Sequence, residues 1–136
     1  NDYGDVKKRR ALQNDPKINP PLYTYLHIPV VKLQSQVVIG YTCYGLVPAT
    51  VSSYDIYWIV VSNDLQGQGL GKRLMAETEK IILQSGGKQV YAETSSREQY
   101  EPTHKFYESC GFQKEAFLKN FYADNDGKII YSKVLK

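Results

Sequence analysis

Three glycines at alternate positions, Gly67, Gly69 and Gly71, have the spacing in this chain that most directly suggests chemistry. They follow a stretch rich in valine and isoleucine, and they lie where a helical pattern begins. Glycine allows positive φ and lets the backbone approach a ligand closely. The first amides of a helix have no intrahelical acceptor, and the helix dipole is positive there. The loop therefore predicts a site for an anion, most often a phosphate, and Lys72 and Arg73 add positive charge to it.

Two families of phosphate-binding loops can be tested against these glycines. A P-loop requires Gly-Lys followed by Ser or Thr, whose hydroxyl binds magnesium. Here Gly71-Lys72 is followed by Arg73, so that hydroxyl is missing. A dinucleotide-binding fold requires Gly-x-Gly-x-x-Gly and an acidic residue about 20 positions later. Glu93 lies at a suitable distance, but the glycine spacing differs and too little chain follows to build that sheet.

A second motif, Phe-Tyr-Glu-Ser-Cys-Gly-Phe, occupies residues 106–112. Together with Gln66-x-x-Gly69-x-Gly71 after a valine-rich strand, it resembles the GNAT superfamily of N-acetyltransferases. The resemblance covers residues 22–135, and three further segments look like a bacterial subgroup of unassigned substrate: 54–58, 93–97 and 121–122. It implies an α/β (α+β) GNAT fold, with a mixed central sheet, an antiparallel N-terminal meander, a strand–helix–strand crossover and flanking helices. It also implies one domain, 1–136, in which 1–21 is partly irregular. The chain departs from the family pattern in that the first strand and helix are expected to be missing or shortened.

The resemblance implies acetyl-CoA as the cofactor and a primary amine of a small molecule or peptide as the acceptor. The loop amides would hold the pyrophosphate. A bulge near Ile59–Val61 would open a strand edge for the pantetheine arm, and a backbone N–H there could face the thioester oxygen. Tyr100 occupies the position where many members have an asparagine. The expected cofactor contacts are Ile59, Val60, Val61, Gln66, Gly67, Gln68, Gly69, Leu70, Gly71, Lys72, Tyr100 and Tyr107.

Acetyl transfer to an amine requires an acid for the departing thiolate and a base for the attacking amine. Tyr107 is the candidate acid, because a phenol with a pKa of about 10 is protonated at neutral pH. The alternative role for Tyr107 is a packed aromatic beside Phe106 and Phe112. Glu93 and Asp55 are the candidate bases, acting directly or through water. A surface salt bridge or a loop hydrogen bond is an equally good explanation of either carboxylate.

Trp58 and Tyr122 are the candidate side chains for binding the acceptor, although most aromatic residues simply pack in a core or an interface. Cys43 and Cys110 lack the spacing of a metal site or a disulfide framework, so we expect them to be small packing residues. We expect His104 to have a structural or an exposed role. No metal site is expected.

The composition restricts the function further. A chain of 136 residues is long enough for one domain with a core. The net charge of +3 suits an anionic cofactor and does not require a nucleic acid. No apolar run reaches the roughly 18 residues of a membrane span, and no signal peptide is visible. We therefore expect a cytoplasmic protein without a nucleic-acid or membrane partner, and a homodimer remains an option.

The segments before the glycine loop predict a three-stranded antiparallel meander whose last strand is central in the sheet. A short helix near Asp5–Gln13 and an irregular linker should precede it. The expected strands are Ile28–Leu33, Val37–Val47 and Tyr54–Val61, with turns at 34–36 and 48–53.

The segments after the loop predict a helix at Leu70–Gln84 and a strand at Lys88–Thr94. This order implies a right-handed parallel crossover. The cofactor should enter where the sheet opens between Tyr54–Val61 and Lys88–Thr94. The expected remaining elements are a helix at Thr103–Cys110, a strand at Phe112–Leu118, a turn-rich loop at Asn120–Gly127 and a strand at Lys128–Leu135.

Three functions compete at this point. The first is an acetyl-CoA-dependent N-acetyltransferase that acts by direct transfer. The second is an acyl-CoA sensor or accessory protein without turnover, which a missing first strand and helix would favour. The third is a nucleotide-binding module, which the missing P-loop hydroxyl disfavours.

Overall fold

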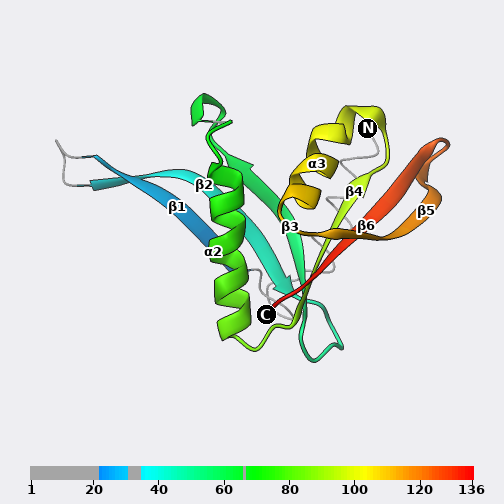
Figure 1. Cartoon of the computed structure of the whole chain (residues 1–136), viewed down its shortest axis with the longest axis horizontal. Coiled ribbons are helices and arrows are strands. Elements are labelled where there is room, and N and C mark those ends of the chain that lie inside the picture. The colour runs from blue at the N-terminus through cyan, green and yellow to red at the C-terminus, as the bar shows by residue number, and fades with distance from the viewer. Residues whose placement is uncertain (1–21, 31–34, 66) are drawn as a thin grey trace.

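The computed structural model describes residues 22–30, 35–65 and 67–136. The expected helix near Asp5–Gln13 and the linker after it lie outside these residues, and so does the segment to which the expectation of a missing or shortened first strand refers. Six strands form one mixed sheet in the order β1-β2-β3-β4-β6-β5. Two helices, α2 and α3, lie over one face of this sheet (Figure 1). The architecture is thus a mixed α/β fold, as the sequence predicted.

The first three strands form the predicted antiparallel meander: β1 (Leu22–Val30), β2 (Ser35–Leu46) and β3 (Ser53–Val61). The predicted start of the first strand at Ile28 is wrong. Thr24 and Leu26 are buried while Tyr23 and Tyr25 are exposed, which is the alternation of a half-buried strand. The strand therefore begins earlier, among residues that pair with the end of β2.

The turn predicted at residues 34–36 is also wrong in part. Ser35 and Gln36 already belong to β2, where they pair with Val30 and Pro29. Pro29 lies next to the last residue of the edge strand β1, a place where a residue without an N–H is tolerated.

The predicted crossover is present. The helix α2 spans Leu70–Gln84, as expected, and β4 (Gln89–Ser95) returns parallel to β3. A short 3-10 turn at Asn63–Leu65 leads from β3 toward the glycine loop. Gly69 is the N-cap of α2 and has a φ of 74°, a conformation that favours glycine.

The C-terminal part contains a 3-10 turn (Glu98–Tyr100), α3 (Glu101–Ser109), β5 (Gln113–Ala123) and β6 (Asp126–Val134). The loop predicted at Asn120–Gly127 is wrong, because both strands continue through it to a turn at Asp124–Asn125. Asn125 has a φ of 61° there, and asparagine tolerates this left-handed conformation better than most residues. The resulting hairpin projects past α3 (Figure 1).

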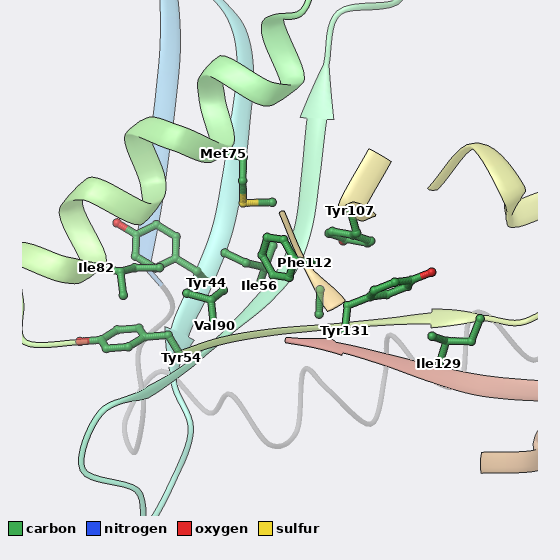
Figure 2. Close-up of a cluster of buried hydrophobic side chains, with 11 residues drawn as sticks. Tyr44, Tyr54, Ile56, Met75, Ile82, Val90, Tyr107, Phe112, Ile129 and Tyr131 are labelled. Carbon is green, nitrogen blue, oxygen red and sulfur yellow. The ribbon is translucent and has the colours of Figure 1, made fainter. Parts of the chain in front are cut away.

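The main core lies between the two helices and the middle of the sheet, as Figure 2 shows. Its buried side chains are Tyr44, Tyr54, Ile56, Met75, Ile82, Val90, Ala92, Tyr107, Phe112, Ile129 and Tyr131. Because Met75 and Tyr107 belong to this same cluster, α2 and α3 are packed together through it. The core thereby sets the position of the α3 residue that the sequence suggested as an acid.

Candidate active site

The sheet opens between β3 and β4. These parallel strands pair from Ser53 to Ile56 on β3 and from Gln89 to Ala92 on β4, and the pairing stops there. The remainder of β3 stays paired with β2 as far as Val61. The predicted opening between these two strands is therefore confirmed.

A β-bulge in β3 lies where the opening begins. Cys43 of β2 is opposite Trp58, while the next residue, Tyr44, is opposite Ile56, so Tyr57 is the extra residue. The bulge predicted near Ile59–Val61 is thus wrong in position. A bulge bends its strand and increases the local twist. At Tyr57 it acts directly after the last residue that pairs with β4, so it turns β3 away from its neighbour.

A cavity of about 850 Å³ lies in this opening. From β3 it is lined by Tyr57, Trp58, Ile59 and Val61. From the glycine loop and the first turn of α2 it is lined by Gly67, Gly69, Leu70, Gly71 and Lys72. The glycine loop and the free edge of β3 therefore face the same space.

The geometry of the glycine loop leaves this space open. Gly67 and Gly69 have φ of 82° and 74°, and a Cβ built on either residue would meet nothing within 4 Å. Gly71 differs, because a Cβ there would lie 3.0 Å from the Phe106 ring. The first two glycines thus provide conformation and access, whereas Gly71 permits close packing of α2 against α3.

The helix α3 supplies the opposite wall through Phe106, Tyr107 and residues near its two ends. Tyr107 is only 5% exposed, and its ring lies 5.5–5.6 Å from the rings of Phe106, Phe112 and Tyr131. It therefore both packs in the core and lines the cavity. Pro102, in the first turn, suits a helix start because it lacks an N–H.

The third wall of the cavity is formed by β4 and β5, and it carries the carboxylate of Glu93. Glu93 and Thr94, at the end of β4, and Tyr122, on β5, line the cavity. Glu93 Oε1 lies 3.0 Å from Lys128 Nζ, and the Tyr122 ring meets the Phe121 ring edge-on at 5.0 Å. The structure thus brings the candidate acid Tyr107, the candidate base Glu93 and the aromatic residues Trp58 and Tyr122 around one cavity.

Other predicted site residues lie elsewhere. Asp55 belongs to the fully paired part of β3 and does not line the cavity. Its neighbours Tyr54 and Ile56 point into the core, so alternation along the strand directs Asp55 to the other face. Tyr100, at the N-cap of α3, is half-buried and also lies outside the cavity lining. Val60 and Gln68 are exposed and do not line the cavity, and Gln66 lies outside the described residues.

Sequence reasoning missed several lining residues, namely Tyr57, Leu65, Thr94, Pro102, Thr103, Phe106 and Ser109. Tyr57 lines the cavity at the bulge, whose position no local pattern indicated. Phe106 could have been found, since it adjoins Tyr107 in the second motif.

The two cysteines and His104 lie outside the cavity lining. Burial raises the pKa of the Cys43 and Cys110 thiols, which favours the unreactive protonated form. His104 is buried, and its Nε2 lies 2.7 Å from the Ser95 carbonyl oxygen. Within the described part of the chain, no cluster of acidic, histidine or cysteine residues could hold a metal ion, and no helix could cross a membrane.

A family model described as an acetyltransferase (GNAT) domain matches residues 25–114 of this chain. No curated protein matches the sequence significantly. Among solved structures, a Desulfovibrio desulfuricans protein assigned to the GNAT family of acetyltransferases is 46% identical, with a TM-score of 0.71. That match covers 73% of this chain and 63% of the other.

Two more distant structures have the same fold. The Escherichia coli ribosomal-protein-S18-alanine N-acetyltransferase is 18% identical, with a TM-score of 0.69, and the match covers 95% of this chain and 77% of that one. A Bacillus anthracis protein named for streptothricin acetylation, solved with acetyl coenzyme A, is 22% identical, with a TM-score of 0.65. That match covers 73% of this chain and 57% of the other. The present chain therefore spans less than two thirds of the Desulfovibrio and Bacillus proteins.

Proposed function

Because this chain belongs to the GNAT family of acetyltransferases, we propose that it transfers an acetyl group from acetyl-CoA directly to a primary amine. The observation that carries the proposal is the single cavity shared by the glycine loop, the open edge of β3, Tyr107 and Glu93. A binding loop alone would suit many anionic ligands. An acid and a base across the same opening suit a transfer reaction.

The fit of acetyl-CoA rests on the glycine loop and the opened sheet. The positive φ and the open surroundings of Gly67 and Gly69 leave the backbone accessible to a pyrophosphate. The amides of residues 67–72 would hold that group at the positive end of α2. The β3 edge from Trp58 to Val61, which is unpaired toward β4, would hydrogen-bond the pantetheine arm. When bound, the cofactor supplies an activated acetyl group as a thioester.

Tyr107 is proposed to hold the proton that the departing sulfur requires. Its burial within the core restricts the ring to a narrow range of positions. A protonated phenol at neutral pH can donate through Oη. A backbone N–H of the opened β3 edge would face the carbonyl oxygen and stabilise the charge that develops there.

Glu93 is proposed to receive the proton that the amine loses, directly or through a water molecule. The amine nitrogen bonds to the acetyl carbon, the carbon–sulfur bond breaks, and Tyr107 Oη gives its proton to the sulfur. One proton thus leaves the amine and one reaches the thiolate. Glu93 is favoured over Asp55 because only Glu93 lines the cavity.

The acceptor is proposed to be a small-molecule or peptide amine that enters on the side of Trp58 and Tyr122. Proteins of related fold are named for acetylating an alanine of a ribosomal protein or an aminoglycoside, so the fold alone does not select one class of acceptor. Here two aromatic side chains and Glu93, whose carboxylate is paired with Lys128, border the acceptor side.

Binding can be tested with the single tryptophan of the chain, Trp58, which lines the cavity. Addition of acetyl-CoA should change its fluorescence in a saturable manner, and ATP or NAD at the same concentrations should not. Equal responses to all three would instead support a general nucleotide-binding module.

Turnover separates the enzyme from the acyl-CoA sensor. Release of free CoA should be measured with acetyl-CoA alone and with a panel of phenethylamine, spermidine, an aminoglycoside and a peptide with a free N-terminus. An amine-dependent increase supports the transferase. Tight acetyl-CoA binding without release for any amine would favour the sensor.

A further inference from the structure

The position of Tyr122 is not determined by regular strand pairing. In the β5–β6 hairpin, Leu118 is opposite Lys128 and Ala123 is opposite Asp126, with a register shift between these pairs. Residues 119–122 therefore face Gly127 alone. The Asn125 N–H donates to Asn120 Oδ1 at 2.9 Å, which joins this bulged segment to the hairpin turn. Whatever holds the turn therefore also holds the segment that carries Tyr122.

Asp126, the first residue after the turn, joins the hairpin to the end of β4. Asp126 is only 8% exposed. The Ser95 hydroxyl donates to Asp126 Oδ1 at 2.5 Å, and Arg97 Nη1 lies 3.8 Å from Asp126 Oδ2. The Arg97 N–H donates in turn to Ser95 Oγ at 3.1 Å. A buried carboxylate is costly unless such partners surround it, so this contact strongly favours one position of the turn.

The next residues reinforce the contact through the backbone. The Ser96 N–H donates to the Gly127 carbonyl at 2.8 Å, and the Gly127 N–H donates to Ser96 Oγ at 2.9 Å. We call the five residues of this contact the turn anchor: Ser95, Ser96, Arg97, Asp126 and Gly127. Ser95 and Asp126 are 31 positions apart in the sequence, and neither lines the cavity.

The turn anchor also reaches α3. His104 Nε2 lies 2.7 Å from the carbonyl oxygen of Ser95, so its N–H can donate there, and His104 Nδ1 lies 3.2 Å from Glu101 Oε2. His104 precedes Tyr107 by about one helical turn. Ser95 in turn follows Glu93 on β4 by two residues. The anchor therefore links the three walls that carry Tyr122, Glu93 and Tyr107.

We propose that Asp126 is a positioning residue, which holds the hairpin wall bearing Tyr122 against β4 and α3 at the acceptor side of the cavity. This role rests on the acetyl transfer proposed above, since it concerns the acceptor side of that site. Asp126 touches neither reactant. It acts through Ser95 and the turn, and its loss should affect the acceptor more than acetyl-CoA, whose proposed contacts lie on β3 and α2.

The test compares Asp126→Asn with Asp124→Asn, an exposed carboxylate of the same turn region. In Asp126→Asn, hydrogen exchange of a peptide covering residues 117–128 should accelerate about tenfold, while a peptide covering 70–84 is unchanged. The KM for the fastest amine of the panel should rise roughly 3- to 10-fold, with the acetyl-CoA dissociation constant within about twofold of wild type. Asp124→Asn should behave as wild type in every measurement.

Ser95→Ala removes the hydroxyl donor without changing the charge of Asp126. It should reproduce the same local pattern and keeps the test available if Asp126→Asn does not fold. Unchanged exchange of residues 117–128 in both variants, or the same effect from Asp124→Asn, would overturn the proposal. Accelerated exchange of 70–84 together with 117–128 would also overturn it, because the role would then be general stability.

The two proposals fail separately. If the wild-type protein binds acetyl-CoA but acetylates no amine, the proposed transferase function fails, and the exchange comparison still decides whether Asp126 holds the hairpin. If amine turnover is present and the KM in Asp126→Asn equals that of wild type, only the positioning role is lost.

Discussion

Lys128 Nζ lies 3.0 Å from Glu93 Oε1, across the paired strands β6 and β4. The two side chains are 13% and 22% exposed, so water screens this pair less than it would a surface pair. Lys128 Nζ also lies 4.3 Å from the centre of the Phe121 ring. Because Glu93 lines the cavity and Lys128 does not, the lysine holds the carboxylate from outside the cavity wall.

The first prediction is that Glu93→Gln slows acetyl transfer. The amide preserves the shape of the side chain but cannot accept the proton of the amine, so kcat should fall roughly 100-fold, within the usual range for a lost general base. The acetyl-CoA dissociation constant should change little. Steady-state rates with a saturating amine and calorimetry with acetyl-CoA measure the two effects.

Asp55→Asn is the matched control for this prediction, because Asp55 was the other candidate base and lies outside the cavity lining. Its kcat should stay within about threefold of wild type. A larger loss in Asp55→Asn than in Glu93→Gln would reverse the assignment. Equal rates in both variants and wild type would point to water alone as the proton acceptor.

Local patterns were sufficient to predict the centre of the fold. The helix Leu70–Gln84 was predicted with its observed bounds, because its apolar spacing and the glycines at both ends are properties of neighbouring residues. The parallel crossover and the opening of the sheet followed from the order of elements. The sequence could not decide whether Glu93 or Asp55 is the base, since the base must lie at the strand end that faces the opening, and only the folded sheet shows which end that is.

Contacts between distant residues account for most of what the sequence did not predict. The bulge at Tyr57 is defined by its pairing with β2, and the sequence of β3 alone contains no signal for it. The polar residues of the hairpin around Asp124–Asn125 resemble a turn-rich segment, so the sequence predicts a loop there. In the folded chain both strands continue to this turn, and Asp126 at the start of β6 accepts a hydrogen bond from Ser95, which lies 31 positions earlier. Such a contact becomes visible only when the chain is folded.

The second prediction concerns Tyr107. Tyr107→Phe removes only the hydroxyl, and the ring should remain packed among its aromatic neighbours. If Tyr107 protonates the departing sulfur, turnover should fall roughly 10- to 1000-fold while acetyl-CoA affinity holds. A single-turnover measurement is needed, because it isolates the transfer step from product release.

Tyr100→Phe is the control for Tyr107→Phe, since Tyr100 lies at the N-cap of the same helix but outside the cavity lining. Its single-turnover rate should match wild type. Full activity of Tyr107→Phe with a lowered melting temperature would reduce Tyr107 to a packing role.

The third prediction separates ligand binding from backbone strain in the glycine loop. Gly69 and Gly86 both have positive φ, 74° and 91°, and a Cβ at either position would meet nothing within 4 Å. Gly69→Ala and Gly86→Ala should therefore destabilise the fold similarly, by about 1 kcal/mol each. Only Gly69→Ala should weaken acetyl-CoA binding, roughly tenfold, because Gly86 follows the far end of α2.

Urea unfolding and calorimetry on the same two preparations check this comparison. Equal acetyl-CoA affinity in Gly69→Ala, Gly86→Ala and wild type would remove the loop from the binding site. A similar loss of affinity in both variants would attribute the effect to strain in α2.

The last prediction follows from Tyr131, which is 1% exposed in the core beside Tyr107. Burial, followed by the charge of Glu108, raises the pKa of Tyr131 to about 12. The unfolded chain should titrate this phenol at about 10, so the folded state favours the protonated form by roughly 3 kcal/mol. Because the folded pKa is the higher one, this contribution is complete below about pH 10 and is lost as the pH rises toward about 12.

The free energy of unfolding of the wild type should therefore fall more steeply between about pH 10 and about pH 12 than that of Tyr131→Phe, which has no phenol to ionise there. Urea titrations across that range measure both slopes, with Tyr91→Phe as the control because the Tyr91 hydroxyl bonds Gln89 at the surface. Parallel curves for wild type and Tyr131→Phe would mean that Tyr131 ionises as easily in the folded protein as in the unfolded chain.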